Sequence, residues 1–91
     1  MDKKYSFKLF FNDGRTKLLG SRASTPENLK YDFDGLVSLE EYYSITDRAL
    51  SSKEVVNFAK KIYNSKYNNE ISKIEIINIL TNEVIVTSDK Q

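Results

Sequence analysis

Acidic and aromatic side chains gather in one stretch of the chain, and they have the clearest capacity for binding chemistry. Residues 24–47 hold six carboxylates and a single lysine, although the whole chain carries a net charge of only +1. Carboxylates attract a basic partner during the encounter and form ion pairs with its lysine or arginine side chains. Tyrosine rings supply contact area at a low cost in conformational entropy. We therefore predict that segment 31–43 presents an acidic surface to a basic protein partner. Its binding residues would be Tyr31, Asp32, Asp34, Glu40, Glu41, Tyr42 and Tyr43.

The same segment has a second interpretation that requires no partner. Its rings could belong to the hydrophobic core, and its carboxylates could form a solvated edge. That edge would balance residues 1–23, which carry six basic and two acidic side chains.

Segment 30–41 also resembles an EF-hand calcium loop. Asp32 and Asp34 fall at loop positions three and five, Gly35 at the sharp turn, and Glu41 at the bidentate twelfth position. The resemblance covers 12 residues and departs from the motif at its first position, which is a lysine. The incoming helix would also have to pass through a glycine and the only proline. A calcium site is therefore the least favoured interpretation, and we predict no metal and no cofactor.

A different binding chemistry is indicated by the basic residues near the N-terminus. In the predicted strand, alternation places Phe10 on the same face as Lys8. A ring among cations on a strand surface is a common way to stack and hold single-stranded nucleic acid. A nucleic-acid-binding module that uses Lys8, Phe10, Arg15 and Lys17 is therefore the alternative function.

Catalysis is not indicated by any group of residues. The chain has no cysteine and no histidine, which removes the thiolate nucleophile and the usual general base near neutral pH. Its three glycines are isolated, so no glycine-rich phosphate loop is present. We predict that the protein is not an enzyme.

Two β-hairpins are predicted. Residues 5–20 alternate around Asp13-Gly14, which favours a two-residue type I′ turn with Leu9 opposite Leu18 and Phe11 opposite Thr16. Residues 72–87 form the second hairpin. The alternation of its isoleucines shifts by one residue along the strand, which indicates either a bulge or a strand covered on both faces. Asn82 suits a left-handed turn position.

One main helix is predicted over residues 52–66, with Ser51 and Glu54 as a capping box and one apolar face. Residues 21–30 are predicted to be a connecting loop with a short helical turn near 26–31. Residues 38–50 carry conflicting signals. Ser38 and Glu41 could cap a helix, but the run of β-prone residues favours a fifth strand near 41–46.

These elements predict one small α+β domain over residues 1–91, in which a mostly antiparallel sheet packs on the helix and residues 88–91 form a loose tail. No apolar run suits a signal peptide or a membrane span, so we expect a cytoplasmic protein. The excess of lysine over arginine is typical of low-GC bacteria and their phages. A small adaptor or inhibitor, encoded by a phage or a mobile element, would fit that composition. An edge strand of either hairpin could also pair with a second copy and form a homodimer.

Overall fold

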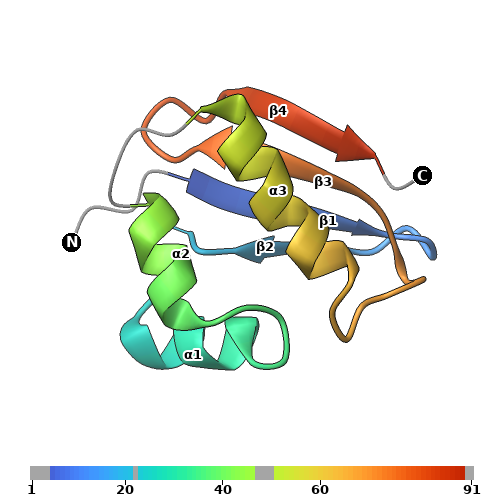
Figure 1. Cartoon of the computed structure of the whole chain (residues 1–91), viewed down its shortest axis with the longest axis horizontal. Coiled ribbons are helices and arrows are strands. Elements are labelled where there is room, and N and C mark those ends of the chain that lie inside the picture. The colour runs from blue at the N-terminus through green and yellow to red at the C-terminus, as the bar shows by residue number, and fades with distance from the viewer. Residues whose placement is uncertain (1–4, 22, 47–50, 90–91) are drawn as a thin grey trace.

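The computed structural model describes residues 5–21, 23–46 and 51–89. In these residues, four antiparallel strands form one open sheet. The fold is α+β, as predicted. Along the chain the elements are β1 (Tyr5–Phe11), β2 (Thr16–Leu19), α1 (Pro26–Phe33), α2 (Leu39–Thr46), α3 (Ser52–Tyr63), β3 (Ile71–Asn78) and β4 (Val84–Asp89). Helix α3 crosses one face of this sheet, α2 lies beside α3 toward β2, and α1 lies beyond the β2 edge (Figure 1). None of the helices in these ranges is long and apolar enough to cross a membrane.

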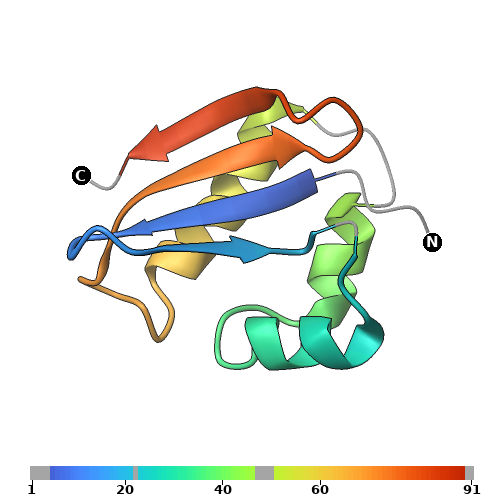
Figure 2. The same ribbon diagram turned by 180° about the vertical axis from the view of Figure 1, so that it is seen from behind.

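The two hairpins join through their first strands, which gives the strand order β2-β1-β3-β4. Phe7 of β1 pairs with Ile76 of β3, and Leu9 pairs with Ile74. All four side chains are fully buried beneath the helices. The opposite face of the sheet carries no helix of the described residues, as the view from behind shows (Figure 2). The core therefore lies on one side of the sheet only.

The turn of the first hairpin differs from the prediction. Gly14 donates to the carbonyl of Phe11 (3.0 Å) and itself has φ of +92°, whereas Asp13 has a negative φ, so the turn is not type I′. The pairing shifts by one residue, and Leu9 lies opposite Lys17 rather than Leu18. Because side chains alternate between faces, this shift moves Leu18 to the uncovered face of the sheet. In the turn, the backbone N–H of Arg15 donates to the Asp13 carboxylate and lowers its pKa.

The second hairpin confirms the predicted bulge and the predicted turn residue. The register shifts between Ile76 and Ile77, and Asn82 has φ of +61°. The predicted tail was wrong in part, because Ser88 belongs to β4 and is buried. The Tyr63 hydroxyl donates to the Ser88 carbonyl and ties the strand to α3. Residues 90–91 of the predicted tail lie outside the described residues.

Helix α3 begins where predicted and ends earlier. The Ser51 hydroxyl accepts from the Glu54 backbone N–H (3.3 Å), and the Glu54 carboxylate accepts from the Ser51 N–H (3.4 Å). This capping box is the predicted one. The helix ends at Tyr63, so Lys66 lies beyond it rather than on its apolar face. The side chains of α3 that form part of the core are Phe58, Ala59, Ile62 and Tyr63.

Helix α1 begins at Pro26, as predicted, and extends two residues beyond the short helical turn predicted near 26–31. Thr25 accepts a hydrogen bond from the Asn28 N–H (3.2 Å), and proline takes the first helical position, as its chemistry favours. The helix extends to Phe33 because Leu29 and Phe33, one turn apart, are both buried. Burial of this pair stabilises the second turn of α1.

The predicted fifth strand was wrong, because residues 39–46 form helix α2. The Ser38 hydroxyl accepts from the Glu41 backbone N–H (3.1 Å), so the capping signal prevailed over the β-prone run. Tertiary packing supports the helix: Tyr42 is fully buried, and its ring lies 4.6 Å from that of Phe33. The Tyr42 hydroxyl donates to the carbonyl of Gly20 (3.3 Å), which fixes α2 against the end of β2.

Candidate functional site

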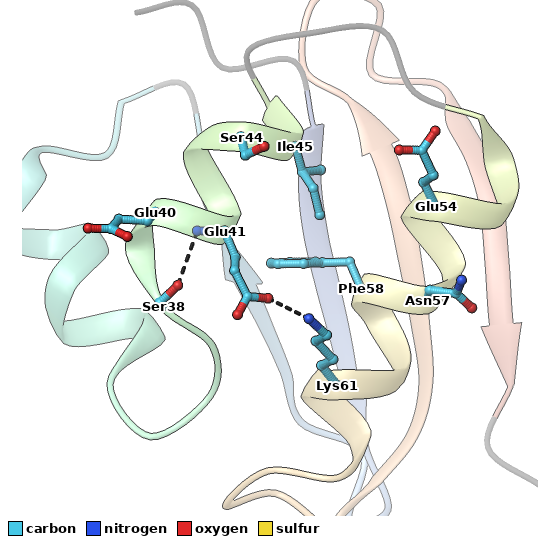
Figure 3. Close-up of a pocket in the computed structure, with 9 residues that line it drawn as sticks. All are labelled: Ser38, Glu40, Glu41, Ser44, Ile45, Glu54, Asn57, Phe58 and Lys61. Carbon is cyan, nitrogen blue, oxygen red and sulfur yellow. Dashed lines mark hydrogen bonds and ion pairs between the residues drawn. The ribbon is translucent and has the colours of Figure 1, made fainter.

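A cleft of about 580 Å³ lies between α2 and α3, on the helical side of the molecule. Figure 3 shows the side chains that line it. One wall is formed by four residues of α2 and by Ser38, which caps it, and the other wall by four residues of α3. The lining residues are Ser38, Glu40, Glu41, Ser44, Ile45, Glu54, Asn57, Phe58 and Lys61.

The cleft combines an apolar centre with a charged rim. The Phe58 and Ile45 side chains lie between the two helices, and Glu41 points across the gap toward Lys61 (Figure 3). Oε2 of Glu41 and Nζ of Lys61 are 2.7 Å apart, and both side chains remain about half exposed, at 44% and 59%. An exposed ion pair of this kind contributes only ~0–1 kcal/mol, so water or a competing cation can separate the two groups.

The charge of the cleft is negative. Among the described residues that line it, Glu40, Glu41 and Glu54 are acidic and Lys61 alone is basic. The Glu40 carboxylate points away from α3 (Figure 3). The Glu54 carboxylate also accepts hydrogen bonds at the start of α3. The site can therefore attract a cation, and its apolar centre can accommodate the alkyl stem of a lysine or arginine side chain.

The predicted acidic surface is divided by the structure. Glu40 and Glu41 line the cleft, and Glu40 is exposed. Tyr42 is fully buried and Tyr43 packs partly against the core, so the prediction that Tyr42 contacts a partner was wrong. The physical reason is the helical period: residues 42 and 43 turn toward the sheet while residues 40 and 41 turn away from it.

The residues predicted on the other half of that segment lie on or beside α1 and do not line the cleft. Tyr31 is 78% exposed. The Asp32 carboxylate lies 3.8 Å from the Lys17 ammonium group, and Asp34 caps the C-terminal end of α1 with its side chain exposed. This half of the predicted surface is thus a separate patch in which one carboxylate already has an internal partner.

The contribution of α3 to the site is not predicted by the sequence. The sequence predicts Glu54 in the capping box and on the solvated side of the helix, Phe58 on its apolar face and Lys61 on its solvated side. Each assignment is locally correct. The cleft arises from the packing of α3 beside α2, and Glu41 and Lys61 are 20 residues apart in the chain. No local pattern reports a contact of that range.

The calcium-loop resemblance is contradicted by the backbone. Residues 30–33 belong to α1 and residues 39–41 to α2, so the segment is two helix ends joined by a short connection rather than a ligand loop. Asp32 and Glu41 pair with lysines instead. In the ranges that the structure describes, no group of three or more metal-ligating side chains could hold an ion.

The four residues of the nucleic-acid alternative do not form one surface. Lys8 and Phe10 face the uncovered side of the sheet, by alternation with the buried residues of β1. Arg15 lies at the hairpin turn, 2.7 Å from the Asp13 carboxylate. Lys17 points to the helical side, where its ammonium group donates to the Tyr67 hydroxyl (3.3 Å).

Comparison of the chain with protein-family models, with curated proteins and with solved structures gave no match. The candidate function therefore rests on the geometry and charge of the described residues.

Proposed function

We propose that this chain is a protein-interaction domain that binds a basic segment of a protein partner in the cleft between α2 and α3. In that role it serves as a small adaptor or inhibitor of the partner. The proposal keeps the acidic surface expected from residues 31–43 but locates its centre at Glu41, with α3 as the second wall.

One observation supports the proposal above all others. The described residues that line the cleft include three glutamates and one lysine, and its apolar centre is formed by Phe58 and Ile45. A lysine or arginine side chain has the matching chemistry, because its stem is apolar and its end is cationic. Docking of a basic side chain would place its alkyl stem against Ile45, which is partly exposed, while the charged end stays near the rim. The Phe58 ring is already buried and forms the base of the cleft.

A peptide titration tests this function. The probe is fluorescein-labelled hexa-lysine, followed by fluorescence anisotropy at 20 mM and 150 mM salt, with hexa-glutamate as the control peptide. The protein should bind hexa-lysine and not hexa-glutamate. The variant Glu40→Gln/Glu41→Gln should bind about 1.4- to 5-fold more weakly for each carboxylate removed, since exposed charge pairs contribute ~0.2–1 kcal/mol.

A matched variant separates the cleft from the general charge of the protein. Glu27 and Glu83 are exposed and lie outside the cleft lining, so Glu27→Gln/Glu83→Gln removes the same charge elsewhere. This control should retain wild-type affinity. Equal weakening by both double variants, or wild-type binding by the cleft variant, would disprove the proposed site.

A further inference from the structure

A second surface lies on the opposite side of the molecule, on the sheet face that none of the described helices covers (Figure 2). Strand β1 contributes Lys8 and Phe10 to this face, and β3 contributes Lys73, which pairs directly with Phe10 across the strands. All three side chains are partly exposed. This surface shares no residue with the cleft and does not depend on the function proposed for it.

The Phe10 ring is flanked by two cations. The Lys73 ammonium group lies 4.3 Å from the ring centroid, and the Lys8 ammonium group lies 5.3 Å from it. These separations are within the range of cation–π attraction. The arrangement therefore holds an aromatic face and two mobile positive charges within one small area of a rigid sheet.

We propose that this face binds single-stranded nucleic acid, with one base stacked on Phe10 and the adjoining phosphates held by Lys8 and Lys73. Aromatic rings accept any base because every base has a π face, and lysines track the backbone charge. Lysine stems are flexible, so each ammonium group can leave the ring for a phosphate when a base takes its place.

Charge on this face favours an anion over a second copy of the chain. Two copies packed face to face around a two-fold axis would bring Lys8 and Lys73 of each copy close to the same lysines of the other, and like charges at close range are destabilising. Two acidic residues adjoin these lysines in the sheet register: Glu75 pairs with Lys8, and Asp89 pairs with Lys73. The Glu75 carboxylate also lies 3.8 Å from the Lys73 ammonium group. Glu75 should therefore weaken binding of a phosphate, which gives the proposal a variant that gains affinity.

Fluorescence anisotropy with fluorescein-labelled (dT)12 and rU12, from 20 to 150 mM KCl, tests the proposal on the full chain. Phe10→Ala should weaken binding at least 5-fold, because stacking is lost. Phe10→Leu keeps an apolar side chain without a ring and should weaken binding as much, whereas Phe10→Trp should bind at least as tightly as the wild type.

Lys73→Ala should reduce the slope of log K against log salt by about 0.7, as expected for one lost phosphate contact on a single strand. Glu75→Gln should tighten binding.

Lys60→Ala is the matched control, because Lys60 is exposed on α3 and its removal changes the net charge by the same amount as Lys73→Ala. It should leave oligonucleotide binding unchanged. The proposal is overturned if the wild type does not bind at 20 mM KCl, if Phe10→Leu binds like the wild type, or if Lys60→Ala weakens binding as much as Lys73→Ala. Sedimentation of the free protein supplies one further outcome: a dimer that Phe10→Ala dissociates would make this face a contact between copies and would refute the proposal.

Discussion

Gly20 lies against the Tyr42 side chain and leaves no room there for a side chain of its own. Gly20 has φ of +75°, a conformation that residues with a Cβ adopt at a cost. A Cβ at this position would overlap the Tyr42 hydroxyl, which itself donates to the Gly20 carbonyl. Ser6 donates to the same carbonyl (3.1 Å), so one backbone group joins β1, the end of β2 and α2.

Gly20→Ala should consequently lower the free energy of unfolding by about 2–5 kcal/mol, from the strain of a positive φ together with the overlap on Tyr42. Urea denaturation followed by circular dichroism measures the loss. Gly14→Ala is the control, because Gly14 also has a positive φ of +92° but has no atom within 4 Å of an added Cβ. It should cost only about 1–2 kcal/mol. Equal losses for the two variants would show that Tyr42 does not constrain Gly20.

Lys61 forms an ion pair with the Glu41 carboxylate, with which a basic partner would have to pair. If Glu41 contributes to the proposed cleft, Lys61→Ala should tighten hexa-lysine binding by about 2- to 5-fold, since it frees Glu41 and removes a like charge from the site. Lys60→Ala lowers the net charge by the same amount on the exposed side of α3 and should change the affinity less than 2-fold. Anisotropy at 20 mM salt distinguishes the two. Equal gains for Lys60→Ala and Lys61→Ala would mean that only overall charge matters, and that the Lys61–Glu41 pair has no role.

Elements were predicted well wherever a short sequence carries its own signal. The capping box at Ser51, the proline at the start of α1 and the phase change in β3 each act within a few residues, and each element they mark is present. Helix α2 carried two local signals that disagreed. Its β-branched and aromatic residues favoured a strand, whereas the Ser38 cap favoured a helix. The burial of Tyr42 against Phe33 and Phe7 supports the helix over the strand.

Ser38→Ala tests whether the cap stabilises α2. The variant removes the hydroxyl that accepts from the Glu41 N–H and should lower the free energy of unfolding by about 0.5–2 kcal/mol. Ser38→Asn keeps a capping acceptor and should stay within a few tenths of a kcal/mol of the wild type. Urea titrations of the three proteins provide the comparison. A loss for Ser38→Asn equal to that for Ser38→Ala would contradict a capping role.

The site could be predicted only in part, because its two walls come from segments that are far apart in the sequence. The sequence places Glu40 and Glu41 in an acidic stretch, and both line the cleft. The identity of the second wall depends on how α3 lies beside α2, which is a consequence of packing on the sheet rather than of any local pattern.

The one-residue error in the predicted register of the first hairpin also arises because tertiary packing selects the pairing. Asp13-Gly14 suits a type I′ turn, but it equally suits the observed turn with Gly14 alone at positive φ, and the buried pairing of Phe7 with Leu19 selects the register.

At the scale of the molecule, the sheet separates two surfaces of opposite character. The helical side carries the acidic cleft, and the uncovered side carries Phe10 between two lysines. Both surfaces depend on the central strands, because β1 supplies Phe7 to the core beneath α3 and Phe10 to the opposite face. The stability of β1 and β3 should therefore set the stability of both surfaces.

Native-state hydrogen exchange tests this order of stability. Strands β1 and β3 are each paired on both sides, and Phe7, Leu9, Ile74 and Ile76 at their centres are fully buried. Their hydrogen-bonded amides should therefore exchange slowest, with opening free energies close to that of global unfolding. Helix α2 has only eight residues, too few for a helix to be stable by itself, and it is secured mainly through Tyr42. Its amides should exchange faster than those of α3, whose capping box and four buried side chains hold it to the sheet. If α2 amides were protected as long as those of β1, the cleft would be rigid on both walls, and adjustment of α2 around a docked basic side chain would be ruled out.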